Sequence, residues 1–97
     1  MVWRGPVTLR PSGSFMELLP LHSEISGYLD KHGLGKKFLK QQGLFSKNPF
    51  HPSLHTELLE PRHLRVWSFR IDRRYRAIFI FRSPDIVEII DVNDHYQ

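Results

Sequence analysis

The sequence predicts an α+β fold with the element order β-α-α-β-β-β, in which two N-terminal helices pack on one face of a small, mainly antiparallel four-stranded sheet. Apolar residues recur at helical spacing through the first half of the chain. In the second half, apolar and polar residues alternate as they do along strands. Short polar segments separate the alternating runs, which favours consecutive hairpins. Helices on one face leave the other face partly free, and we expect function there.

The first elements are short. Residues 7–10 predict a strand that ends at the turn cluster Pro11-Ser12-Gly13. Ser14 and Glu17 have the spacing of a capping box, which favours a helical turn starting at Ser14. Pro20 has no amide N–H to donate, so it either ends that turn or opens the next helix.

Two amphipathic helices follow. The first has an apolar face made of Leu21, Ile25, Tyr28 and Leu29. A break with two glycines separates it from the second helix. The second helix begins near Leu34 and has an apolar stripe of Leu34, Phe38 and Phe45. Its opposite side carries Lys36, Lys37, Lys40 and Lys47. Asn48-Pro49 ends this helix, because a residue before proline disfavours the α region.

The second half of the chain predicts strands. Residues 50–63 are rich in proline and histidine and predict an ordered loop with a short strand near 54–59. Runs of alternating residues then cover 66–71, 75–81 and 86–92. In the first run, alternation places Arg70 on the same side as Val66 and Ser68. We expect four aromatic residues to belong to the core: Trp67, Phe69, Phe79 and Phe81.

Length and composition limit the classes of function. A chain of 97 residues predicts one domain over residues 1–97, too small for a cofactor-binding lobe, so we expect no cofactor. The absence of cysteine excludes disulfides, Cys-ligated zinc and thiol nucleophiles. No apolar run is long enough to span a membrane and no signal sequence is evident, so we expect a cytoplasmic protein. His51 and His55 have a nominal metal spacing, but Pro52 lies between them and no third ligand is near, so no metal is expected.

The formal charge of +4 is unevenly distributed. Residues 62–76 carry +5, from six arginines and one acid, Asp72. The arginines are Arg62, Arg65, Arg70, Arg73, Arg74 and Arg76. The residues after Arg76 carry −3. Such a stripe suits nucleic acid or an acidic protein partner, and the alternative is a solvated face that is balanced elsewhere.

A set of short motifs occurs in a fixed order along the chain. They are Asn48-Pro49-Phe50-His51-Pro52-Ser53-Leu54-His55, Leu58-Leu59, Val66-Trp67-Ser68-Phe69-Arg70-Ile71-Asp72, Tyr75-Arg76-Ala77-Ile78-Phe79 and the closing His95-Tyr96. In this order, in a short basic chain, they resemble the RelE/ParE superfamily of toxin–antitoxin toxins. The resemblance covers residues 34–97, and the first third by element order. It is nearest to the YoeB/Txe-like endoribonuclease branch, which also ends in a His-Tyr pair.

This resemblance implies an mRNA interferase that inhibits translation, with a cognate antitoxin protein, mRNA and the ribosome as partners. Cleavage would need neither metal nor cofactor, because a 2′-hydroxyl attacks the adjacent phosphate and leaves a 2′,3′-cyclic phosphate and a free 5′-hydroxyl. The reaction requires a base, an acid and cations for the phosphorane charge.

Carried over by position, the resemblance makes Glu57 the base, His95 the acid and Arg76 the phosphate clamp. Arg70 would support Arg76, and Tyr96 would position the nucleotide or tune His95. Further RNA-binding residues would be Arg65, Arg73, Arg74, His55 and His63. The lysine cluster of the RelE branch is not evident between Pro52 and Arg65, and histidines occupy that region instead. The resemblance therefore leaves Glu57, His55 and His63 as candidates for the base.

Other readings of the same residues stay open. Glu57 could be solvent-exposed without a role or pair with Arg65. Arg70 and Arg76 could be ion-pair partners of Asp72, Asp91 or Glu88. Two other functions fit the resemblance: a non-catalytic ParE-like toxin that inhibits gyrase, and an inactive relative that mainly binds an antitoxin.

Overall fold

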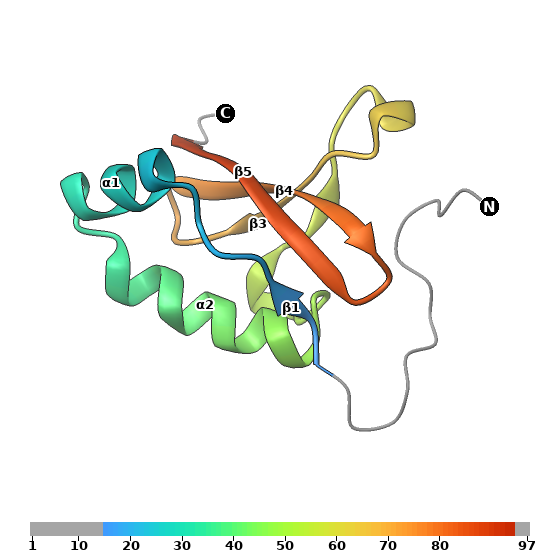
Figure 1. Cartoon of the computed structure of the whole chain (residues 1–97), viewed down its shortest axis with the longest axis horizontal. Helices are drawn as coiled ribbons and strands as arrows, with labels where there is room; N and C mark the ends of the chain where they lie inside the picture. The colour runs from blue at the N-terminus through green and yellow to red at the C-terminus, as the bar shows by residue number, and fades with distance from the viewer. Residues whose placement is uncertain (1–14, 95–97) are drawn as a thin grey trace.

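The computed structural model describes residues 15–94 (Figure 1). The helices are α1 (Ser23–Lys31) and α2 (Gly35–Lys47), and the strands are β1 (Glu17–Leu18), β2 (Glu57–Leu58), β3 (Trp67–Arg70), β4 (Tyr75–Ser83) and β5 (Ile86–Asp94). Two 3₁₀ turns, η1 (Pro52–Leu54) and η2 (Arg62–Leu64), flank β2. The strand expected at residues 7–10, His95 and Tyr96 lie outside the described residues.

The predicted α+β fold is confirmed, with one difference in the sheet. The described strands form a five-stranded sheet, not a four-stranded one, in the order β1-β5-β4-β3-β2. β1 runs parallel to β5, and the other neighbours are antiparallel. The short strand expected near residues 54–59 is β2, and it adds an edge strand beside β3.

The helical turn expected from Ser14 and Glu17 is wrong at Glu17, which belongs to β1. The amide of Glu17 donates to the Asp85 carbonyl at 2.8 Å, and the amide of Leu19 donates to the Val87 carbonyl at 2.9 Å. Pairing with β5 satisfies backbone groups that one isolated helical turn would leave unpaired, so the long-range contact outweighs the local capping signal.

The helix boundaries follow the local signals in the sequence. Gly33 separates the two helices with a φ of +66°, a left-handed conformation that costs glycine little. The second helix ends at Lys47, and Asn48 is extended, with a φ of −155°, before Pro49. Neither helix in the described part of the chain has the length and apolar character that a membrane crossing requires.

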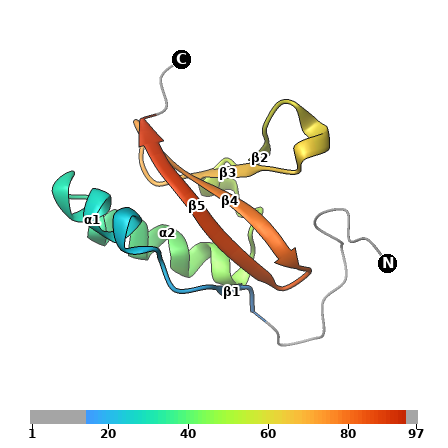
Figure 2. The ribbon, with the colours of Figure 1, turned by 45° about the horizontal axis from the view of Figure 1, so that its top comes forward.

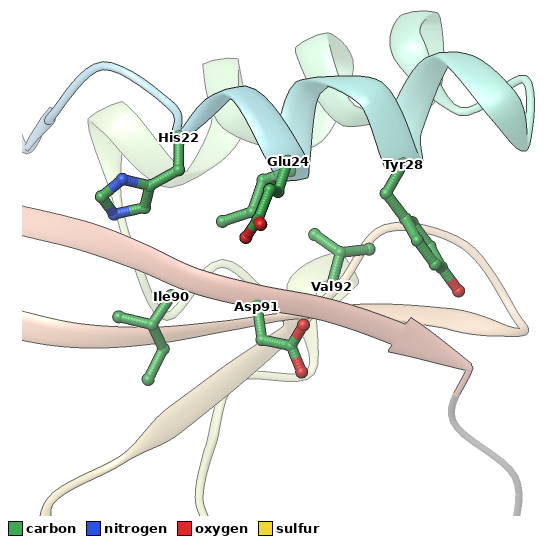
Figure 3. A pocket seen from close by; sticks show the side chains of 7 residues that line it. His22, Glu24, Tyr28, Ile90, Asp91 and Val92 are labelled. Carbon is green, nitrogen blue, oxygen red and sulfur yellow. The ribbon is translucent and has the colours of Figure 1, made fainter.

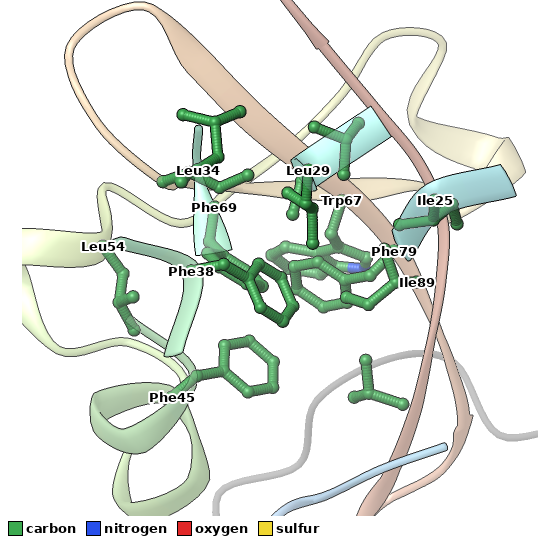
Figure 4. Close-up of a cluster of buried hydrophobic side chains, with 14 of the residues drawn as sticks. Ile25, Leu29, Leu34, Phe38, Phe45, Leu54, Trp67, Phe69, Phe79 and Ile89 are labelled. Carbon is green, nitrogen blue, oxygen red and sulfur yellow. The ribbon is translucent and has the colours of Figure 1, made fainter. Parts of the chain in front are cut away.

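Both helices cover one face of the sheet (Figures 1 and 2). The core between these layers is aromatic, as expected: Phe45, Phe69 and Phe79 are fully buried (Figure 4). The Phe45 ring centroid lies 5.0 Å from those of Phe69 and Phe79. Trp67 is buried as well, and Phe81 packs partly buried against this cluster.

The opposite face of the sheet carries the polar residues of the central strands. In β4, Ala77 and Phe79 belong to the core, so alternation directs Arg76 and Ile78 away from the helices. Cross-strand pairing places Ser68 opposite Ile78 on the same face. Arg76 and its cross-strand partner Arg70 therefore lie on this face.

Candidate functional site

Arg76 is held at the centre of the face away from the helices. Its cross-strand partners are Arg70 in β3 and Asn93 in β5. Arg76 is 4% exposed. Its Nε donates to Ser68 Oγ at 2.9 Å, and its Nη2 donates to the His55 carbonyl at 2.6 Å. Arg76 is thus buried against β3 and the loop before β2, not against the helices.

Glu57 lies beside this arginine. It pairs with Ser68 in the register of β2 and β3, which brings its side chain to the same face. Its Oε1 lies 3.6 Å from Arg76 Nη2, and 57% of the side chain is exposed. Glu57 therefore pairs with Arg76 rather than with Arg65, and its carboxylate is open to solvent.

The charge around Arg76 is only partly balanced. Burial lowers the pKa of Arg76, the Glu57 carboxylate opposes that shift, and the nearby Arg70 charge lowers the pKa further. Like charges at directly opposite positions destabilise a strand pair. Within residues 15–94 no carboxylate forms an ion pair with Arg70. A bound anion would relieve the repulsion between these two guanidinium groups.

The three carboxylates considered as alternative partners are engaged elsewhere. Asp72 Oδ2 accepts a bond from Lys37 at 3.0 Å. Glu88 bonds His22 at 2.8 Å and lies 2.7 Å from Arg82. Asp91 accepts from the side-chain amide of Asn93. None of these contacts involves Arg70 or Arg76.

Of the other expected RNA-binding residues, His55 alone lies at this site. Its carbonyl bonds Arg76, its φ is +48°, and its side chain is exposed. His63 and Arg65 are exposed at η2, before β3, whereas Arg73 and Arg74 lie in the hairpin after β3. The two pairs therefore lie at opposite ends of that strand.

Arg74 has a partner of its own. Its Nε lies 3.0 Å from Asp94 Oδ1, and its Nη2 lies 3.2 Å from Asp94 Oδ2, so the two side chains form a bidentate pair between the β3–β4 hairpin and the end of β5. This contact raises the pKa of Arg74. Arg74 is thus used to join the ends of two strands.

Ser68 is the site residue that the sequence analysis did not single out. It is fully buried although it is polar, and it accepts the hydrogen bond from Arg76 Nε. Alternation had already placed it beside Arg70 and opposite Trp67 and Phe69. The sequence feature that could have identified Ser68 is a small hydroxyl residue on the same side of the strand as Arg70.

A separate pocket of about 230 Å³ lies between α1 and β5 (Figure 3). Its lining residues include His22, Glu24, Tyr28 and Asp91, and Figure 3 shows the Glu24 carboxylate beneath α1. Burial raises the pKa of Tyr28, and Tyr75, Asp94 and Asp91 add to that shift. The acidic lining makes this pocket a poor place for a phosphate.

Comparison with known proteins identifies the fold. No family model matches the chain. No curated protein matches it in sequence. Among solved structures, a YoeB/ParE toxin from Agrobacterium tumefaciens superposes with a TM-score of 0.63 at 18% identity, covering 84% of this chain and 100% of that chain. The fold that the resemblance implies is thereby confirmed: the chain shares the fold of this YoeB/ParE toxin.

Proposed function

We propose that this chain is the toxin of a toxin–antitoxin system and that it cleaves mRNA, in the ribosome, without a metal ion or cofactor. Its proposed partners are a cognate antitoxin protein, mRNA and the ribosome, all in the cytoplasm. The fold it shares with a YoeB/ParE toxin supports a role as a toxin. One observation supports phosphate chemistry in particular: the like-charged pair Arg70–Arg76 lies beside the exposed carboxylate of Glu57.

In this proposal Glu57 removes the proton from the ribose 2′-hydroxyl. The 2′-oxygen then forms a bond to the adjacent phosphorus, and the bond from phosphorus to the 5′-oxygen breaks. Arg76 and Arg70 stabilise the negative charge that accumulates on the phosphorane oxygens. His95 donates a proton to the leaving 5′-oxygen, and Tyr96 orients the nucleotide or His95. The products are a 2′,3′-cyclic phosphate and a 5′-hydroxyl.

The environment of Arg76 suits electrostatic catalysis. Ser68 and the His55 carbonyl hold the guanidinium in one orientation before any substrate arrives. A charge that is already oriented needs no reorganisation when the phosphorane forms. The exposed side chain of His55, on the same segment as Glu57, is the alternative base.

The test is cleavage of ribosome-bound mRNA by the purified chain, with the new RNA ends analysed chemically. Glu57→Gln is expected to lower kcat by roughly 10²–10⁴-fold, the usual contribution of a general base. Because Glu57 Oε1 lies 3.6 Å from the buried Arg76, the substitution also removes a counter-charge. The kcat values are therefore compared at a temperature at which thermal unfolding shows the variant to be folded. Glu60→Gln is the matched control, since Glu60 is an exposed carboxylate whose bond is to Arg62.

The RNA cleavage assay, together with a DNA supercoiling assay, separates the alternatives. A large loss in His55→Ala with full activity in Glu57→Gln would assign the base to His55. Intact RNA together with inhibited DNA supercoiling would contradict the nuclease and indicate a toxin that binds gyrase. Intact RNA and unaffected supercoiling would indicate an inactive relative.

A further inference from the structure

A second cationic surface lies on the helix side of the sheet, between α2 and the β3–β4 hairpin. It is a cleft of about 320 Å³. Four cationic residues line it: Lys37, Lys40, Arg70 and Arg73. The two lysines are three residues apart on α2, so they share one face of the helix. The two arginines come from the end of β3 and from the hairpin.

A buried glutamine holds the sides of this cleft together. Gln41 is 7% exposed. Its Nε2 donates to the Arg70 carbonyl at 2.7 Å and to the Ser53 carbonyl at 3.2 Å. These two bonds connect α2 to β3 and to η1. The cationic residues of the cleft therefore lie on elements that Gln41 holds together.

Asp72, the carboxylate that lines the cleft, does not neutralise it. Its Oδ1 accepts hydrogen bonds from the amides of Arg74 and Tyr75, both at 2.8 Å, and its Oδ2 accepts one from Lys37. Asp72 thus shapes the hairpin and pairs with one lysine. Within residues 15–94 neither Lys40 nor Arg73 forms an ion pair, and both are exposed. The lining carries a formal charge of +3.

We propose that this cleft binds the phosphodiester backbone of single-stranded RNA and guides the strand toward Arg76. Arg70 connects the two places, because it lines the cleft and is also the cross-strand partner of Arg76. An RNA strand with one phosphate at Arg76 carries further phosphates beside it, and these require neighbouring cations. This inference rests on the proposed function in taking RNA as the partner.

The experiment measures binding separately from cleavage. A fluorescein-labelled, 2′-O-methylated single-stranded RNA is used, because it lacks the 2′-hydroxyl nucleophile and stays intact. Affinity is measured by anisotropy over a range of salt concentrations for the wild-type chain and for Lys40→Ala/Arg73→Ala. Each lost phosphate contact lowers the slope of log affinity against log salt by about 0.7 for a single strand, so the double variant should lose about 1.4.

The matched control is Lys31→Ala/Arg62→Ala, which removes the same charge from two exposed residues outside the cleft. Its slope should remain that of the wild type. If the double variant unfolds, the single variants Lys40→Ala and Arg73→Ala replace it, each with half the loss. An equal loss in both double variants would mean that binding follows net charge and would overturn the proposal.

Two other results would also overturn it: an unchanged slope in the cleft variant, and binding of poly-glutamate in place of RNA. The outcome for the cleft is distinct from that for the nuclease. Cleavage by a wild-type chain whose RNA binding ignores the cleft would remove this inference and keep the proposed function. RNA binding that depends on the cleft, without any cleavage, would keep this inference and contradict the proposed nuclease function.

Discussion

Arg76 is a buried cation, and its burial makes each of its hydrogen bonds important for stability. Ser68 is fully buried and accepts the bond from Arg76 Nε. Ser68→Ala leaves that N–H without its acceptor while keeping a small side chain in the strand. An unsatisfied buried donor costs about 1–3 kcal/mol. We expect the free energy of unfolding, measured in urea, to fall by about that amount.

Ser26→Ala is the control for this substitution, because Ser26 is a half-buried serine on α1. Its effect should stay within about 0.5 kcal/mol. A Ser68→Ala variant as stable as the Ser26→Ala variant would mean that Arg76 does not depend on the hydroxyl.

Among the elements, α2 joins the core on one side and the cationic cleft on the other. Phe45 faces the sheet, is fully buried, and contacts Phe69 and Phe79. Phe45→Ala leaves a cavity in an aromatic cluster, and truncation of a buried phenylalanine costs about 3–5 kcal/mol. The urea midpoint of the variant should fall accordingly, to the point where a domain of this size is only marginally folded.

Leu39→Ala on the same helix provides the comparison. Leu39 is 66% exposed, so its truncation should change the unfolding free energy by no more than about 0.5 kcal/mol. Similar losses at both positions would contradict the orientation of α2 against the sheet.

For the whole molecule, the pKa shifts predict loss of stability in acid. Burial raises the pKa of Asp72, but bonds from the Tyr75 and Arg74 amides and from Lys37 lower it by more in sum. The bond from His22 lowers the pKa of Glu88, and Arg82 adds to that effect against burial. Both carboxyls therefore have folded-state pKa values below the ordinary 3.8 and 4.5.

A lowered carboxyl pKa contributes stability above the unfolded-state value and loses it as the pH falls toward the folded-state value. We expect the urea midpoint to decrease as the pH drops below about 4.5, the ordinary value for Glu88. Asp72→Asn/Glu88→Gln should be less stable at neutral pH and should show a flatter pH dependence. A slope equal to that of the wild type would contradict this assignment.

Local patterns in the sequence predict much of the fold. The aromatic alternation in β3 and β4, the apolar stripe of α2 and its end before Pro49 depend on neighbours within a few residues. Glu17 is a position where the local pattern is misleading. Its capping spacing favours a helical turn, yet pairing with β5 makes it a strand residue. The residues around Glu17 do not indicate that a strand about seventy positions away will accept its backbone hydrogen bond.

The candidate site, too, could be predicted only in part from the sequence. Glu57, Arg70 and Arg76 could be named from the resemblance, and alternation placed Ser68 beside Arg70. The sequence could not show that Arg76 is buried against Ser68 and the His55 carbonyl, nor that Arg74 is committed to Asp94. Those contacts depend on strand register and on the path of the loop before β2.

By itself, the sequence determined the order of the elements, the aromatic core and the basic stripe, because periodicity and composition are local properties. Only the tertiary structure decided which residues of the basic stripe lie at the Arg76 site and which line the cleft beside α2. Strand pairing buries Arg76 beside Glu57, and packing of α2 on the sheet brings Lys37 and Lys40 next to Arg70 and Arg73. Residues thirty positions apart become one charged surface only when the folded chain brings them together.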